Sequence, residues 1–388
     1  GSLGNQVMDD LGNFPYLATY GTNSSYNYLI NGSKPVIVKA PGLVAPDFTW
    51  ETVTQMDFGF DASFLNNRLT GTFDWYRRNT KDMLVAGATL PATLGASVPK
   101  SNSADMKTIG WELSLGWNDR LENGFSYWVK GVLSDYQATI TKYAGNDAGF
   151  YSQSDGDGKY YVGQKIGEIW GYHSNGLFQS DDEAATIDQS ELYAGKWGAG
   201  DVKYEDLDND GKITKGEETI YNPGDKSIIG NKTPRYQFGI TVGFDYKNFD
   251  FEMFWQGTGK RDYMLSGAQF WGFTSQWDVP YTPALDYWTE TNTDAYFPRP
   301  GWQNGGNRVT SDRYLQSAAY GRLKNLTVGY TIPKNLTTKW GISRLRLYVT
   351  GENLLTITPL NDAFDPETLG GMTYPINRKV AIGLNLTL

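Results

Sequence analysis

The stretch RYQFGITVGFDYKNFDFEMFWQ, residues 235–256, decides the fold class of this chain. Every second residue from Tyr236 to Tyr246 is aromatic or aliphatic, and the residues between them are Gln, Gly, Thr, Gly and Asp. This period of two predicts a β-strand with one apolar face. After a turn at Lys247 and Asn248, the alternation resumes with Phe, Phe, Met and Trp at every second position up to Trp255. The stretch therefore predicts a long β-hairpin.

The same alternation recurs along the chain and predicts an all-β fold with antiparallel strands. Further strands are expected at residues 50–62, 69–75, 109–118, 125–133, 324–332, 344–354 and 379–388. We expect about ten strands in all, and several reach the roughly 9 to 11 residues that a tilted strand needs to cross a bilayer.

The composition agrees with strands and loops rather than helices. Among 388 residues there are 13 Trp, 26 Tyr, 18 Phe and 45 Gly, while only 20% are charged. No apolar run is long enough for a transmembrane helix, and the first residues do not form a secretory signal. The net charge of −9 and the lack of a basic run with interleaved aromatics exclude nucleic acid as an expected partner.

The expected connections between strands are short and long in alternation. The short ones are residues 66–67, 122–124, 247–248 and 333–343, and the long ones are 79–106, 143–234, 257–321 and 356–378. In an antiparallel sheet, alternate connections lie at the same end of the strands. Short turns at one end and long loops at the other are typical of outer-membrane β-barrels, in which the short turns are periplasmic and the long loops extracellular.

The polar faces of the strands favour a barrel with a wet interior. Gln55, Asp57 and Asp61 share one face of an expected strand, which is costly in a dry core and ordinary in a water-filled lumen. In the last strand, the face carrying Leu384 suits lipid and the face carrying Asn385 suits a lumen. The alternative is a secreted, calcium-dependent glycan-binding β protein with a dry core, and a requirement for detergent would separate the two.

One loop has the spacing of a calcium site. The stretch DLDNDGKITKGE, residues 206–217, matches D-x-D-x-D-G followed by five residues and Glu. Pro223 and Gly224 exclude a following helix. The loop is therefore interpreted as a cation site that stabilises a long connection, rather than as a calcium sensor with a pair of helices. Calcium is the expected ion and magnesium the alternative. The expected ligands are Asp206, Asp208, Asp210, the carbonyl of Lys212, Thr214 and Glu217.

No arrangement of residues predicts an enzyme. The chain has no Cys, and its single histidine, His173, has no nucleophile-elbow motif nearby. The 43 acidic residues do not single out a pair of the kind that glycosidases use. A second Asp–Gly stretch, residues 155–158, lacks a terminal Glu and is interpreted as a turn.

Several stretches together resemble one family. They are GSLGNQ (1–6), GEIWGYHSNGLFQSDDEA (167–184), GDVKYEDLDNDGKIT (200–214), IIGNKTPRYQFGITVGFDYKNFDFEMFWQG (228–257), YGRLKNLTVGYTIPKNL (320–336), ISRLRLYVTGENLLTIT (342–358) and FDPE (364–367). In this order and spacing, they resemble the SusC/RagA-like TonB-dependent transporters of Bacteroidetes outer membranes.

The resemblance implies an architecture and a set of partners. Such transporters are barrels of roughly 22 strands around an N-terminal plug. Residues 1–388 would then be the C-terminal part of a transmembrane barrel, about half of its strands, without the plug. The implied partners are the remaining half of the same barrel, outer-membrane lipid, a SusD-like lipoprotein lid and, through the absent N-terminal part, the TonB complex.

The resemblance also implies a function. It is the energy-coupled import of an oligomeric nutrient, a glycan or a peptide, across the bacterial outer membrane. Aromatic residues of the long loops are candidates for contact with the substrate or the lid, and packing of the loops against one another is the alternative. These residues are Trp271, Trp277, Trp288 and Trp302.

Overall fold

The computed structural model describes residues 2–6, 16–23, 29–39, 41–46, 48–86, 98–144, 160–369 and 376–388, together with residues 91, 93, 95, 96, 146, 149 and 374. The stretch 155–158 lies outside the described residues. None of the described helices is long and apolar enough to cross a membrane.

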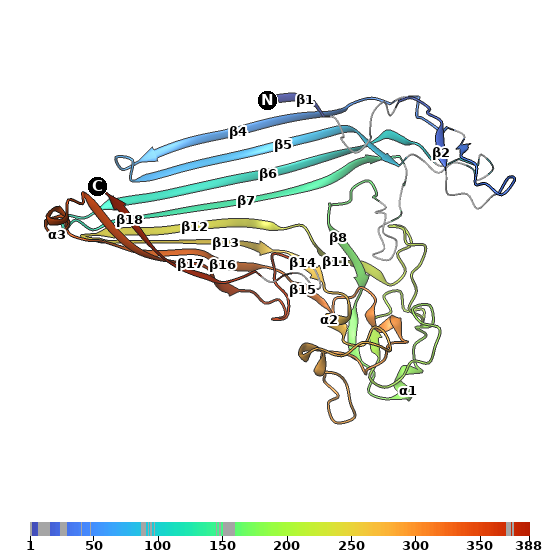
Figure 1. Cartoon of the computed structure of the whole chain (residues 1–388). Helices are drawn as coiled ribbons and strands as arrows, with labels where there is room; N and C mark the ends of the chain where they lie inside the picture. The colour runs from blue at the N-terminus through green and yellow to red at the C-terminus, as the bar shows by residue number, and fades with distance from the viewer. Residues whose placement is uncertain are drawn as a thin grey trace.

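Ten strands form one curved antiparallel sheet, which we call the wall (Figure 1). Across the sheet they are β1 (Ser2–Gln6), β4 (Glu51–Phe64), β5 (Leu69–Ala86), β6 (Lys100–Arg120), β7 (Ser126–Tyr143), β12 (Arg235–Tyr246), β13 (Phe249–Lys260), β16 (Tyr320–Thr331), β17 (Arg344–Ile357) and β18 (Lys379–Thr387). The hairpin predicted from residues 235–256 is confirmed as β12 and β13. Among the described residues, β1 and β18 are the edges of the sheet.

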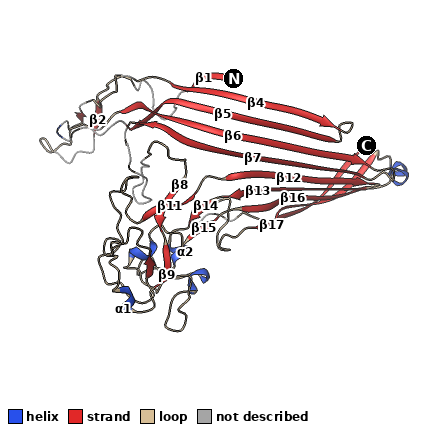
Figure 2. Ribbon diagram, turned by 180° about the vertical axis from the view of Figure 1, so that it is seen from behind, coloured by secondary structure: helices blue, strands red, loops and turns tan. Residues whose placement is uncertain are grey.

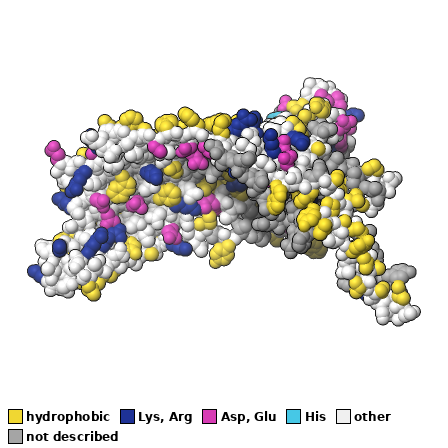
Figure 3. Space-filling model, turned by 90° about the horizontal axis from the view of Figure 1, so that it is seen from above, with side chains coloured by type: hydrophobic (Ala, Val, Ile, Leu, Met, Phe, Trp, Pro, Cys, Tyr) yellow, Lys and Arg dark blue, Asp and Glu magenta, His cyan; other side chains and the backbone are white. Residues whose placement is uncertain are grey.

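The register places apolar residues of neighbouring strands on the same face of the wall. Leu115 is in the same row as Ile240, which pairs with Trp255, and Trp255 pairs with Leu323. The apolar side chains of this face are exposed or half-buried, and the exposed fraction reaches 83% at Ile382 in β18. Figure 3 shows hydrophobic side chains at the surface of the wall.

The other face of the wall is polar. Asp74 of β5 pairs with Glu112 of β6, and Glu112 pairs with Ser134 of β7. Further along, Gly243 of β12 pairs with Glu252 of β13. The wall therefore has an apolar and a polar face, as the alternation predicted, and neither face forms a closed core.

All the short connections lie at one end of the wall, at the left in Figure 1, and the long ones lie at the other end. The expected asymmetry is confirmed, and the largest change of length is in the first long connection. β5 continues to Ala86 and β6 begins at Lys100, so the first long connection is residues 87–99 rather than 79–106. The connection 333–343 contains the short helices α3 (Lys334–Thr337) and η5 (Thr338–Trp340).

Three long connections, described over residues 160–234, 261–319 and 358–369, form a second compact unit that we call the cap (Figure 2). Its elements are β8 (Glu168–Tyr172), β9 (Ser174–Leu177), α1 (Asp181–Ala184), β10 (Val202–Tyr204), β11 (Lys226–Asn231), β14 (Asp262–Met264), α2 (Ala268–Trp271), η3 (Thr282–Leu285), η4 (Gly305–Arg308) and β15 (Leu315–Ser317). A separate hairpin of β2 (Gly21–Asn23) and β3 (Ile37–Lys39) lies between β1 and β4 in the sequence.

The buried core of the chain lies in the cap. Phe270 and Tyr314 are fully buried, and the ring of Trp271 lies 4.6 Å from that of Tyr314 between centroids. All three connections contribute to this cluster, which comprises Tyr172, Leu177, Val202, Tyr204, Ile213, Met264, Leu265, Phe270, Trp271, Phe297, Tyr314, Ala318, Leu360, Phe364 and Leu369. Segments far apart in the sequence therefore fold as one unit.

Candidate cation loop and the polar contacts of the cap

Three of the expected metal ligands converge in the cap. Asp206, Asp208 and Asp210 follow β10, and each offers a carboxylate oxygen within 4.8 Å of the others. The turn that gathers them uses left-handed backbone at Asn209 and Gly211, with φ of 62° and 84°. Asparagine and glycine are the residues that adopt this conformation most readily, which explains their positions in the loop.

Backbone N–H groups orient these carboxylates. Asp206 accepts hydrogen bonds from Asn209 at 2.6 Å and Gly211 at 2.7 Å, and Asp210 accepts one from Lys212 at 2.8 Å. Desolvation raises the pKa of Asp206, but the hydrogen bonds from Gly211 and Asn209 outweigh it and hold the pKa below its ordinary value. Three converging carboxylates are the hard oxygen ligands that calcium and magnesium prefer, so the loop fits such an ion.

The loop is tied to the core of the cap. Asp188 donates its N–H to the carbonyl of Gly211 at 3.0 Å and accepts the N–H of Ile213 at 2.7 Å. Ile213 is fully buried in the aromatic cluster. The loop that carries the three aspartates is thus fixed at its far end by both hydrogen bonds and packing.

Glu217 does not join the three aspartates. It is exposed, and its N–H donates to the carbonyl of Asn222 at 3.0 Å within a tight turn. Among the described residues, the acids that converge are Asp206, Asp208 and Asp210 alone. The spacing of the motif therefore brings together three of the four carboxylates that the sequence analysis expected.

The four tryptophans of the long loops divide into two groups. Trp271 is 7% exposed within the core, and Trp288 packs against that core with its ring over the Cα of Gly200. For these two residues the structure agrees with the alternative, packing of the loops against one another. Trp277 and Trp302 have 82% and 45% of their surface exposed and remain accessible.

His173 links the long connection at residues 160–234 to the one at residues 261–319. Its Nδ1 lies 2.7 Å from Oδ2 of Asp312, and its Nε2 lies 2.7 Å from Oγ of Ser227. The N–H of Ser174 also donates to Asp312 at 2.9 Å. Ser227 lies within the extended strand β11 and not on the sharp strand-to-helix turn of a nucleophile elbow, so we interpret the group as structural.

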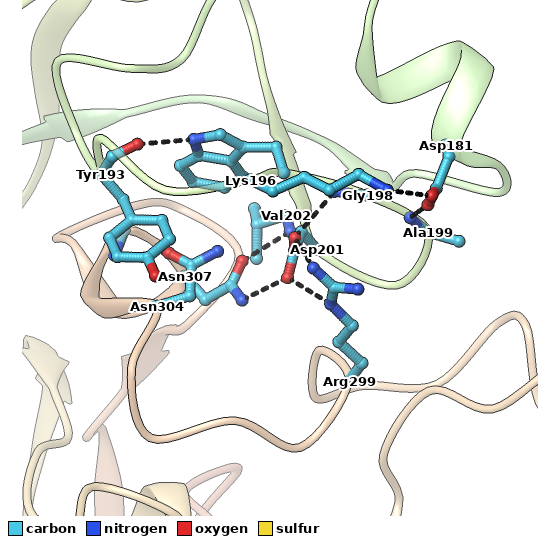
Figure 4. A network of polar contacts seen from close by, with 12 residues as sticks. Asp181, Tyr193, Lys196, Gly198, Ala199, Asp201, Val202, Arg299, Asn304 and Asn307 are labelled. Atoms are coloured by element: carbon cyan, nitrogen blue, oxygen red, sulfur yellow. Dashed lines mark hydrogen bonds and ion pairs between the residues drawn. The ribbon is translucent and has the colours of Figure 1, made fainter.

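Asp201 is the centre of a polar network that the sequence did not indicate (Figure 4). Its fully buried carboxylate accepts hydrogen bonds from Nε and Nη2 of Arg299 at 2.9 and 2.6 Å, from Asn307 at 2.8 Å and from the N–H of Gly198 at 3.0 Å. Asn307 in turn accepts the N–H of Val202 at 2.8 Å. The network joins segments about 100 residues apart, and a motif search would not find it.

The FDPE stretch anchors the third connection on the wall. Arg322 of β16 lies 2.6 Å from Asp365 and 3.1 Å from Glu367, and Lys324 lies 2.8 Å from Glu367. The side chain of Arg322 is almost fully buried. These ion pairs give the FDPE stretch a structural role at the junction of the wall and the cap.

Comparison with known proteins yields a single family. Residues 8–354 match the family model described as TonB dependent receptor-like, beta-barrel. The chain is 29% identical to TonB-dependent receptor P3 of Formosa agariphila over 96% of its own length and 38% of that protein. It is 26% identical to TonB-dependent receptor SusC of Bacteroides thetaiotaomicron over 100% of its length and 36% of that protein.

Solved structures show the same fold. The chain superposes on the RagAB peptide transporter with a TM-score of 0.74 at 21% identity, covering 99% of this chain and 40% of that one. The structure of the RagAB peptide importer in its open-open state gives a TM-score of 0.74 at 22% identity, with 100% and 39% covered. The chain thus spans about two fifths of the length of the proteins that it matches.

Proposed function

Because this chain belongs to the TonB-dependent receptor β-barrel family, we propose that it forms part of the wall and the outer rim of an energy-coupled importer in a bacterial outer membrane. Residues 1–388 would be the C-terminal part of that barrel, and the rest of the same polypeptide would supply the plug and the remaining strands. The single observation that carries this proposal is the two-faced wall, whose exposed apolar face suits lipid and whose polar face suits a water-filled lumen.

The cap belongs on the extracellular side in this proposal. In outer-membrane barrels the short turns are periplasmic and the long loops extracellular, and the cap lies at the long-loop end of the wall. Its buried aromatic core is what a unit folded in water requires. The membrane then lies around the wall alone.

The proposed substrate is an oligomeric nutrient, a glycan or a peptide, taken up together with a SusD-like lipoprotein lid and driven by the TonB complex. The structure of the RagAB peptide importer shares the fold of this chain, and this likeness of fold is the support for the peptide alternative. Trp277 and Trp302 are the accessible cap residues that we propose contact the substrate or the lid. Exposed aromatic rings provide a large contact area with few rotatable bonds.

The cap is also proposed to hold one divalent cation at the loop of residues 206–217. Calcium is the expected ion because the environment outside the cell supplies it at concentrations that suit weak sites. Asp206, Asp208 and Asp210 would bind it, with the carbonyl of Lys212 and the side chain of Thr214 completing the set. The ion would brace the cap, and no catalytic role is proposed for it.

Uptake by the full-length transporter in its own host tests the function. Labelled oligosaccharides and peptides would be offered to cells with and without a working TonB complex, and the proposal expects accumulation of one class only when the complex works. Trp277→Ala and Trp302→Ala should lower uptake roughly 2- to 10-fold at limiting substrate, which corresponds to about 0.5–1.5 kcal/mol per aromatic contact. Trp340→Ala is the matched control, because Trp340 is also exposed but lies at the short-turn end. Accumulation that is independent of the TonB complex would contradict the proposal.

A further inference from the structure

The chain leaves the cation loop at Gly216 and returns to it at Gly224. Both glycines have left-handed backbone, with φ of 57° and 61°. A Cβ on Gly216 would collide with the backbone nitrogen of Gly224, and a Cβ on Gly224 would lie 2.6 Å from the carbonyl oxygen of Thr214. The backbones of Gly216 and Gly224 are therefore in contact. Residues 217–223, including Glu217, form a side loop that is separate from the cation loop.

The contact between Gly216 and Gly224 places Asp225 at the end of the cation loop. The N–H of Asp225 donates to the carbonyl of Thr214 at 3.2 Å, and its Oδ2 accepts the N–H of Thr214 at 2.7 Å. Thr214 is the ninth residue of the motif that begins at Asp206. In space, Asp225 takes the place that a residue shortly after Thr214 would have if the side loop were absent.

Asp225 also holds the beginning of the loop. Its Oδ1 accepts the N–H of Leu207 at 2.7 Å, and Leu207 is the second residue of the motif. One fully buried carboxylate thus joins the two ends of the segment that carries Asp206, Asp208 and Asp210. This clamp fixes the span of the loop before any ion binds.

None of the ion pairs of the described residues includes Asp206, Asp208, Asp210 or Asp225. A buried carboxylate that forms no ion pair is costly, even when N–H groups donate to it. A divalent cation among the three outer aspartates would add a positive charge close to Asp225.

We propose that Asp225, and not Glu217, closes the cation loop. Asp225 acts as a positioning residue that sets the distance between the loop ends, and it is the fourth carboxylate whose charge favours the ion. Glu217 has no part in binding. This inference rests on the proposed cation site and adds to it a residue that lies outside the motif.

Cation affinity of the full-length protein, purified in detergent, tests this inference. Terbium luminescence with calcium competition would be measured for the wild type, Asp225→Asn and Glu217→Gln. Glu217→Gln should bind within about twofold of the wild type, and Asp225→Asn should weaken binding at least tenfold, because it removes one charge and one hydrogen-bond acceptor. Asp225→Glu, which restores the charge on a longer side chain, should recover part of the affinity.

A second readout separates positioning from general support of the fold. The melting temperature would be measured with calcium and with a chelator. The calcium-dependent rise in melting temperature should persist in Glu217→Gln and be lost in Asp225→Asn, whereas a merely structural role would lower both melting temperatures equally and leave that rise unchanged. If Asp225→Asn does not fold, removal of residues 217–223 keeps the question open to test, because binding should survive that deletion.

The outcomes for the site and for Asp225 are distinct. If the wild type binds neither terbium nor calcium, the cation site itself is wrong. If the wild type binds and Glu217→Gln loses affinity as much as Asp225→Asn does, or the deletion of residues 217–223 abolishes binding, then Glu217 is a ligand. In that case the inference about Asp225 is overturned while the cation site stands.

Discussion

The wall and the cap place their large apolar side chains in opposite environments. In the wall, Phe58 of β4 has 69% of its surface exposed, and Met56 and Phe60 on the same face of that strand are also exposed. In the cap, Phe270 is fully buried and contacts Trp271, Phe297 and Tyr314. The strands form the more regular region, yet the described core belongs to the connections between them.

This difference shows which solvent each region is built for. A soluble β protein buries one face of its sheet and leaves its loops without a core of their own. Here the cap is stabilised by burial away from water, whereas the apolar face of the wall needs lipid. A change that damages one region should therefore leave the other largely unaffected, and this expectation can be tested.

The largest effect is expected from Phe270→Ala. Removing a fully buried aromatic ring costs about 3–5 kcal/mol, because the cavity does not close completely. The cap should become sensitive to protease added outside intact cells, while the barrel still inserts and resists unfolding by detergent. Phe58→Ala is the control: the ring lies on the exposed face of the wall, so the cap should stay protected. Loss of barrel insertion in Phe270→Ala would contradict the independence of the two regions.

The wall was predictable from sequence, and the cap core was not. Alternation is a local signal, so residues 235–256 were enough to predict β12, β13 and the face that each side chain occupies. The contacts of the cap join distant residues: the hydroxyl of Tyr204, for example, donates to the carbonyl of Gly306, 102 residues away. No local period marks such a contact, which is why Trp271 and Trp277 could not be told apart in the sequence.

The second prediction concerns the wall. Leu384 lies in the middle of β18 and pairs with Leu347 on the apolar face, whereas Asn385 pairs with Arg346 on the polar face. Leu384→Arg should cost about 2–4 kcal/mol if it lies near the bilayer midplane, and Asn385→Ser should cost much less. Folding yield in lipid vesicles measures the difference for the full-length protein. Equal damage by the two variants would show that the faces are assigned wrongly.

The third prediction tests how the cap holds its separate segments together. Asp201→Asn removes the charge that Arg299 pairs with, and one of the acceptors for its guanidinium is lost. The expected cost is about 1.5–3 kcal/mol, since hydrogen bonds between charged groups are worth more than neutral ones. Water reaches part of Arg299, which limits the loss.

Hydrogen exchange provides the measurement for this variant. Protection should fall together in the segments around Gly198 and Asn307, which the Asp201 network joins, and remain unchanged in β12 and β13. Lys196→Ala is the control: Lys196 pairs with Asp181 at the surface of the cap and should have little effect. If exchange rises around Gly198 only, the two connections do not depend on each other.

The cation loop shows how far a motif can be trusted. The spacing from Asp206 to Asp210 is short enough for the turn itself to gather the carboxylates, and that part of the prediction agrees with the geometry. Glu217 depended on the chain continuing in one direction, and the left-handed backbone at Gly216 diverts it. Glycine allows such a diversion without revealing in the sequence that it takes place.

The smallest loss of stability is expected from a substitution on the polar face of the wall, where side chains pack closely but form no core. On the polar face, the ring of Trp128 lies over Gly243 of the next strand, and a Cβ at that position would collide with the ring. Gly243→Ala should cost about 1 kcal/mol, because Trp128 can swing into the lumen without moving the strands. Folding yield and cap protection should both stay near the wild type, and the fluorescence of Trp128 should shift as its ring enters water. Gly131→Ala is the matched control, because a Cβ there meets no atom within 4 Å. A loss of folding yield as large as that of Leu384→Arg would mean that the wall depends on close packing as strongly as on its apolar face, and the contrast between wall and cap would then be one of degree.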